Sequence, residues 1–184
     1  DTAVVFHLTV LDSGDLSDSD TVEITIKENG IHELPDDAIT FHSTNGKVMG
    51  LDPGSGAVLV SLYSVDPASD NIGDRKKMPE DMIYGLIDFK IKVDKSGDGA
   101  TVTIFFTEAV PKGYKWYKYS QNRGWYDYSA NVLFNSERNQ LSLTLVDGGK
   151  GDDDGEPNGM IEDPSGLGIA SADDANDGNS SGGG

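Results

Sequence analysis

LIDFKIKVDKSGDGATVTIFF, residues 86–106, is the most regular stretch of this sequence. Apolar residues alternate with polar ones over residues 89–93 and again over residues 102–106. A period of two is the pattern of a β-strand that buries one face. The Asp, Ser and Gly residues between the two segments are typical of a turn. The stretch therefore predicts two strands joined by a hairpin turn.

The same alternation recurs on both sides of this stretch, over residues 4–10, 22–26, 58–62, 132–134 and 141–145. Short strands separated by Gly, Asp and Asn turns are typical of a β-sandwich with jelly-roll or immunoglobulin-like packing. We therefore expect an all-β sandwich. The apolar period slips between Leu86 and Phe89, which predicts a bulge or bend near residues 87–88.

Three regions are expected along the chain. Residues 1–29 should form an N-terminal β-hairpin, and residues 30–168 should form the β-sandwich. Residues 169–184 are mainly Ala, Asp, Asn, Ser and Gly. That composition cannot bury a core, so we expect a flexible C-terminal linker. Residues 66–81 are rich in Asp, Pro and Lys and are expected to form a long exposed loop.

The charge balance bears on partners. The 184 residues include 32 acidic and 14 basic side chains, for a net charge of −18. Such a field repels nucleic acid and anionic membranes, so we expect neither nucleic-acid binding nor membrane insertion. It attracts cations, although the acidity could also serve solubility alone. The absence of cysteine excludes disulfides and thiolate chemistry. Nucleophile-elbow, phosphate-loop and dinucleotide motifs are absent, so we expect no enzymatic activity.

An acidic segment near the C-terminus has the spacing of a calcium-binding loop. Asp154, Glu156 and Asn158 occupy the first, third and fifth positions of an EF-hand-type loop. Gly159 follows at the position of the sharp turn, and the carbonyl of Met160 comes next. Hard oxygen donors in a flexible loop suit Ca²⁺. We therefore predict bound calcium, with a solvated acidic linker as the alternative.

Other residues must close this coordination shell. The twelfth position is Ser165, where an EF-hand has a bidentate Glu. The candidates for completing the site, or for forming a second one, are Asp147, Asp152, Asp153, Glu162 and Asp163. We expect Ca²⁺ to order residues 147–163 and to tie them to the preceding strand.

Two other acidic turns are weaker cation candidates. Asp94, Ser96 and Asp98 alternate before a glycine, although a plain hairpin turn also accounts for them. The first hairpin turn carries acids that could hold a cation between modules: Asp12, Asp15, Asp18 and Asp20.

An aromatic run provides the alternative function, a carbohydrate-binding β-sandwich. Trp116, Trp125 and Tyr126 could stack on the rings of a glycan. Strand alternation sends Tyr117 and Tyr119 to one face and Trp116 to the other. At least one of these faces should belong to the core.

Two regions carry family resemblances. The segments FHLTVLD (6–12) and DTVEITI (20–26) resemble the last two strands of a PKD-like or cadherin-like immunoglobulin-type domain. The segments YKY (117–119), GWYDY (124–128), LVDGGKGDDDG (145–155) and NGMIEDPSGL (158–167) make residues 31–168 similar to choice-of-anchor U domains. The second resemblance implies export, and attachment or sorting near the C-terminus of a bacterial surface protein. The anchor itself is expected beyond the Gly-rich linker.

The hairpin of residues 1–29 has an apolar face, and a two-stranded hairpin is marginal alone in water. This apolar face could be covered by further strands of its own domain, by the second region of the chain, or by a neighbouring subunit that pairs through a free strand edge. A head-to-tail contact of the last kind generates a homopolymeric filament. We therefore expect a calcium-binding structural module at the cell surface, active in adhesion, biofilm or filament assembly.

Overall fold

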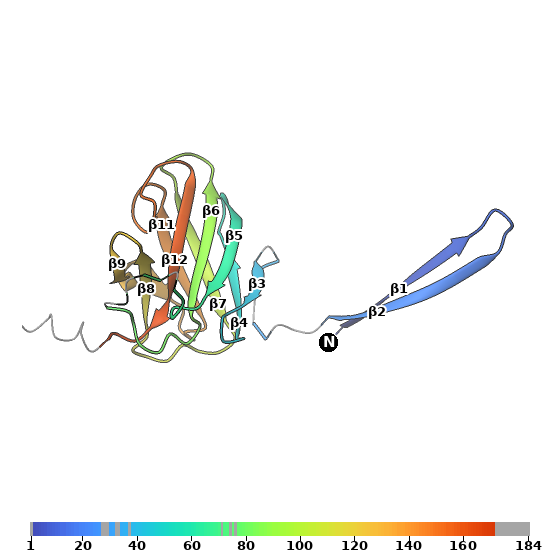
Figure 1. The fold of residues 1–184 in the computed structure, drawn as a ribbon, viewed down its shortest axis with the longest axis horizontal. Helices are drawn as coiled ribbons and strands as arrows, with labels where there is room; N and C mark the ends of the chain where they lie inside the picture. Colours follow the sequence, from blue (N-terminus) through green and yellow to red (C-terminus); the bar gives the residue numbers. More distant parts are fainter. Residues whose placement is uncertain are drawn as a thin grey trace, which may run out of the picture. The chain divides into compact units, whose positions relative to one another are not determined.

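The computed structural model describes residues 2–26, 30–31, 34–36, 38–70, 72–73, 75 and 77–171. These residues belong to two compact units, residues 1–30 and residues 31–184 (Figure 1). Most of the predicted C-terminal linker, from residue 172 onward, lies outside the described residues. Within the described part of the chain, no helix has the length and apolar character needed to cross a membrane.

The first unit is the predicted antiparallel hairpin. β1 (Thr2–Leu11) pairs with β2 (Ser17–Ile26), in a register that runs from Thr2 opposite Ile26 to Leu11 opposite Ser17. Asp12 shapes the turn, because its Oδ1 accepts hydrogen bonds from the N–H groups of Gly14 (2.7 Å) and Leu16 (2.9 Å). Apolar side chains along both strands of this unit are exposed to solvent.

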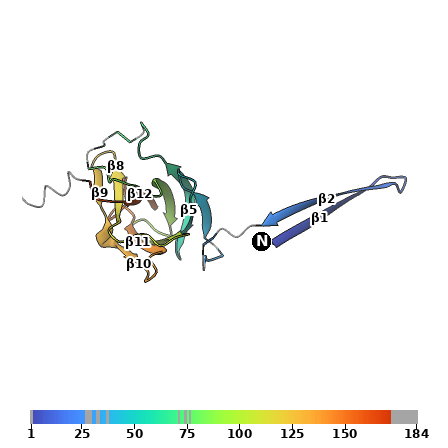
Figure 2. The same cartoon turned by 90° about the horizontal axis from the view of Figure 1, so that it is seen from below.

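The second unit is an all-β sandwich of two five-stranded antiparallel sheets (Figures 1 and 2). The first sheet has the order β10-β11-β7-β4-β3, with β10 Val132–Phe134, β11 Gln140–Val146, β7 Gly99–Phe106, β4 Val48–Asp52 and β3 Ile39–His42. The second has the order β5-β6-β12-β8-β9, with β5 Ala57–Val65, β6 Leu86–Val93, β12 Met160–Gly168, β8 Lys115–Ser120 and β9 Gly124–Asp127. A short 3-10 helix, η1 (Ser129–Asn131), precedes β10.

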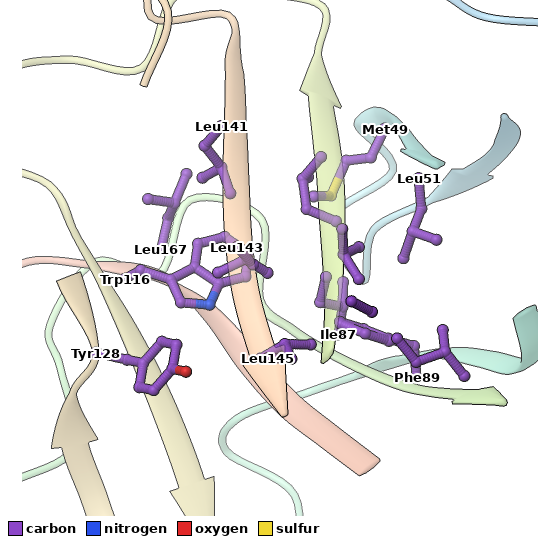
Figure 3. Packing of buried hydrophobic residues seen from close by; sticks show 14 of the residues in the cluster. Met49, Leu51, Ile87, Phe89, Trp116, Tyr128, Leu141, Leu143, Leu145 and Leu167 are labelled. Atoms are coloured by element: carbon purple, nitrogen blue, oxygen red, sulfur yellow. The ribbon is translucent and has the colours of Figure 1, made fainter. Parts of the chain in front are cut away.

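The core lies between the two sheets (Figure 3). Each strand contributes alternate side chains, as the period of two predicts. Phe89 and Ile91 of β6 are fully buried, and so are Val102 and Ile104 of β7. Leu145 of β11 joins them, and in Figure 3 it lies close to Trp116 and Tyr128.

The hairpin turn predicted for residues 94–98 is wrong. Both flanking strands exist, but β6 pairs with β5 and β12, whereas β7 pairs with β4 and β11. The connection therefore crosses from one sheet to the other. Both strands bury one face in the same core, and that requirement is met equally well by strands in facing sheets.

β12 occupies the centre of its sheet, between β6 and β8 (Figure 1). The sequence MIEDPSGLG does not suggest a strand, because Asp, Pro and Gly are rare inside strands. Ile161 and Leu167 are nevertheless buried in the core. Asp163 and Ser165 lie between them in the alternation and face the same way.

The segment predicted as a long exposed loop, residues 66–81, is partly buried in its described residues. Ile72 is buried, and Met78 is partly buried against Tyr117, Tyr119 and Trp125. These contacts form a second hydrophobic cluster on the outer face of the sheet that contains β8. Both faces of β8 are therefore covered.

Of the bulge or bend predicted near residues 87–88, the bulge is wrong. The ladders between β6 and its two neighbours run without interruption through Ile87 and Asp88. The register shift lies instead on β5, between Leu59 and Ser61. The apparent slip in β6 arises because Leu86 packs into the second cluster while Ile87 packs into the core.

Candidate metal centre and buried polar cluster

The loop between β11 and β12, residues 147–159, carries most of the predicted calcium ligands. It is anchored by Asp147, which is 2% exposed. The Asp147 carboxylate accepts hydrogen bonds from the N–H groups of Gly97 (2.7 Å) and Gly159 (2.9 Å). Burial alone would raise the pKa of Asp147, but these and neighbouring backbone donors outweigh it and lower the pKa. Asp147 therefore joins the β6–β7 connection to the acidic loop.

Asp152 is the second buried carboxylate of the loop. Its Oδ1 accepts the N–H of Glu162 (3.0 Å) and its Oδ2 accepts the N–H of Gly148 (2.8 Å). Burial raises the pKa of Asp152, and so do the charge of Asp154 and a hydrogen bond with its side chain, although the two backbone donors oppose this. Two carboxyl groups thus interact at close range. A proton or a cation bound beside these two groups would reduce the repulsion between their charges.

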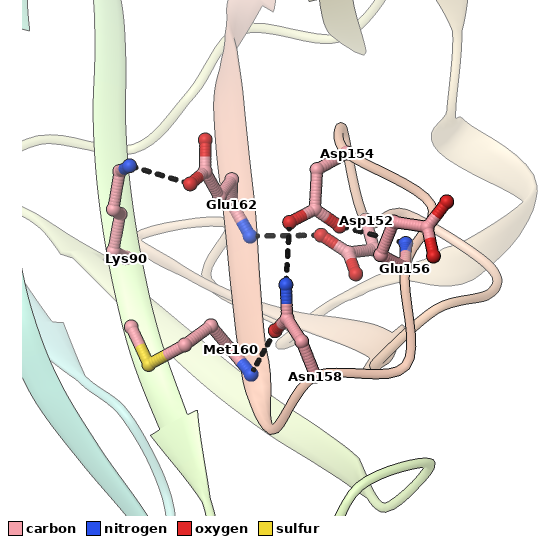
Figure 4. A network of polar contacts seen from close by, with 7 residues as sticks. All are labelled: Lys90, Asp152, Asp154, Glu156, Asn158, Met160 and Glu162. Atoms are coloured by element: carbon pink, nitrogen blue, oxygen red, sulfur yellow. Dashed lines mark hydrogen bonds and ion pairs between the residues drawn. The ribbon is translucent and has the colours of Figure 1, made fainter.

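Asp154 and Asn158 complete this group (Figure 4). Asp154 Oδ1 accepts the N–H of Glu156 (2.8 Å), and its Oδ2 accepts the side-chain amide N–H of Asn158 (2.8 Å). Asn158 Oδ1 in turn accepts the N–H of Met160 (2.8 Å). The predicted first and fifth positions of the loop therefore lie side by side, with the carboxylate of Asp152 beside them.

Two further predicted ligands, Glu162 and Asp163, are engaged elsewhere. Glu162 forms an ion pair with Lys90 at 2.5 Å, and Asp163 points into the sandwich interior. Among the described residues, no three His, Cys, Asp or Glu side chains form a group able to hold a metal ion. The oxygens of Asp152, Asp154 and Asn158 are hard donors that fit Ca²⁺ chemically, in an arrangement with two carboxylates.

The weaker candidates have local structural roles. Asp98 Oδ2 accepts the N–H of Lys95 (3.1 Å), and Ser96 Oγ donates to the carbonyl of Pro157. In the first hairpin, Asp18 and Asp20 accept the N–H groups of the residues that follow them. Asp15 adopts a left-handed backbone conformation in the turn (φ 63°).

Sequence reasoning missed a buried ion pair between β8 and β12. Lys118 Nζ lies 2.5 Å from Asp163 Oδ2, and both side chains are 0% exposed. Lys118 Nζ also donates to the carbonyl of Gly151 (2.6 Å) and lies 5.2 Å from the ring centre of Tyr128. Alternation along KWYKYS placed Lys118 on the same face as Trp116 and was the available signal for its burial.

Burial determines the protonation equilibria of this pair. It lowers the pKa of Lys118, against the opposing effect of the Asp163 charge. It raises the pKa of Asp163, against the opposing effect of Lys118. Both shifts favour the uncharged forms.

A pocket of about 380 Å³ is lined by Arg123, Tyr126, Tyr128 and Asp153, among others. The predicted glycan platform is not formed here, because Trp116 and Trp125 are only 1% and 4% exposed. Tyr126 is half-buried, and the guanidinium of Arg123 lies 3.9 Å from the centre of its ring.

No protein-family model, curated protein or solved structure matches this chain.

Proposed function

We propose that this chain is a calcium-stabilised structural module of an extracellular prokaryotic surface protein. The observation that supports the proposal is the close interaction of the Asp152 and Asp154 carboxyl groups, with the amide of Asn158 beside them. A divalent cation would neutralise this pair without requiring a proton. The net charge of −18 adds a long-range attraction for cations.

Bound Ca²⁺ would stabilise the fold through the position of Asp152. Asp152 accepts a hydrogen bond from the N–H of Glu162, which lies near the start of the central strand β12. A cation held by Asp152, Asp154 and Asn158 would therefore tie the exposed part of the loop to the middle of a sheet. Because the cation binds the folded state, its free energy of binding adds to the free energy of unfolding.

The test is thermal unfolding with calcium and with EGTA. At calcium about 100-fold above Kd, the added stability is about 2.7 kcal/mol, which corresponds to a rise in Tm of about 5–10 °C. Asp154→Asn should lose this rise, because it removes a negative charge from the proposed site. The side-chain oxygen of Asn can still accept the N–H of Glu156, so the turn should be kept. Asp66→Asn is the matched control, since Asp66 is exposed and accepts the N–H of Ala68 in the same kind of turn. An equal Tm in calcium and EGTA for the wild-type chain would exclude the proposal.

We further propose that copies of the chain associate through the edges of β1 and β5. β5 is an edge strand with exposed Val58, Val60 and Tyr63, and its sequence AVLVSLYSV has no charged residue. β1, TAVVFHLTVL, likewise has no Asp, Glu, Lys or Arg and exposes Phe6 and other apolar side chains. In proteins that stay monomeric, exposed edge strands usually carry charged residues that prevent pairing with another chain. The proposed occupant of the β5 edge is therefore β1 of a second copy.

Light scattering tests this association. The wild-type chain should form assemblies larger than a monomer, and Val60→Lys on β5 should reduce their mass. Leu133→Lys is the control, because Leu133 is 77% exposed on β10, an edge strand of the other sheet. A wild-type chain that remains monomeric at high concentration, with calcium present, would contradict the proposal.

A further inference from the structure

Lys118 and Asp163 form a buried pair in which the amine and the carboxyl group are in close contact. Lys118 Nζ lies 2.5 Å from Asp163 Oδ2. Since Oδ2 is bonded to Cγ, the amine nitrogen lies within about 4 Å of the carboxyl carbon, close to the distance of reacting atoms in near-attack geometries. Lys118 of β8 lies opposite Ser165 of β12, so Asp163, two residues along β12 on the same face, is its diagonal neighbour.

The surroundings of the pair favour the reactive forms. Both side chains are 0% exposed, and burial disfavours an ammonium and a carboxylate alike. An uncharged amine is a nucleophile, and an uncharged carboxylic acid is an electrophile at its carbon. The carbonyl of Gly151 accepts one N–H of Lys118 at 2.6 Å, which restrains the orientation of the amine.

We propose that Lys118 and Asp163 form an intramolecular isopeptide bond. The lone pair of Nζ attacks Cγ of the protonated carboxyl group, and the resulting tetrahedral intermediate loses its hydroxyl. The N–Cγ bond forms, one Cγ–O bond breaks, and a proton from the amine leaves with the hydroxyl as water. The amine and acid thus give an amide and one water molecule, without an oxidant, a reductant or another reactant.

The bond would give a cysteine-free chain a covalent link between two adjacent strands of one sheet. It is independent of calcium and of self-association, since it depends only on the contact between Lys118 and Asp163. Lys90 and Glu162 provide an internal comparison: they also lie 2.5 Å apart on neighbouring strands, but their side chains are 41% and 32% exposed. Water keeps that pair charged, so it should remain an ion pair.

The test is the mass of the intact, denatured 184-residue chain. We expect a mass lower than that of the sequence by one water molecule. Trypsin should fail to cut after Lys118 and should release residues 116–123 covalently joined to residues 151–184. Lys90 should be found in an unlinked peptide. A chain of full mass would overturn the proposal, and so would a chain that has lost water while these peptides separate, as succinimide formation at an Asp-Gly step would give.

Variants identify the atoms involved. Lys118→Arg should restore full mass. Asp163→Asn should lose ammonia in place of water, because the leaving group is then an amide nitrogen.

Discussion

Replacing Asp147 with Ala should show how strongly the acidic loop is anchored. The carboxylate is buried and accepts two backbone N–H groups, from Gly97 at 2.7 Å and from Gly159 at 2.9 Å. A hydrogen bond to a charged group contributes about 1.5–3 kcal/mol. Gly97 is exposed, so water can replace one of the lost partners. We therefore expect Asp147→Ala to lower the free energy of unfolding by about 2–4 kcal/mol.

Urea unfolding measures this loss through the fluorescence of the buried Trp116 and Trp125. Asp66→Ala is the control, because Asp66 is exposed and accepts the N–H of Ala68 at 2.8 Å within one turn. It should cost less than about 1 kcal/mol. If Asp147→Ala also costs less than about 1 kcal/mol, the carboxylate does not hold the β6–β7 connection to the loop, and the reasoning is refuted.

Three further outcomes are expected. Because the fold lowers the pKa of Asp147, its stabilising contribution is present above the ordinary Asp pKa of about 3.9 and is lost as the pH falls through the lowered value. Urea unfolding from pH 6 downward should therefore show a shallower acid decline in Asp147→Ala than in the wild-type chain. Gly151→Ala would place a Cβ 2.5 Å from Tyr128 Oη, at φ +85°. At Gly155 the described residues leave the space open, so Gly155→Ala should lose only the backbone penalty at φ +68°, about 1–2 kcal/mol of stability. Gly151→Ala should therefore lower the free energy of unfolding more than Gly155→Ala. Thermal unfolding of the two variants compares these costs. Phe89→Ala should lower the free energy of unfolding by about 3–5 kcal/mol and the exposed Val58→Ala by less than about 0.5 kcal/mol, as measured in urea.

The candidate site was predictable only in part. The spacing of Asp154 and Asn158 correctly placed them together, because the two residues lie within one turn of a short loop. The same spacing does not indicate where the side chain of Asp163, another candidate ligand, points. Its direction depends on β12 being a central strand, and that in turn depends on partners far away in the sequence.

The sequence by itself established an all-β chain, its N-terminal hairpin and most of its strands. Alternation is a local property, so residues 89–93 and 102–106 carry it whatever lies beside them. The pairing of those strands was established only by the tertiary structure. β6 and β7 lie in different sheets, and Lys118 meets Asp163 across two strands that no local pattern connects. The physical reason is that backbone N–H and C=O groups are the same on every strand edge. Local sequence therefore specifies which face of a strand is buried, while the neighbour is selected by the packing of the whole core.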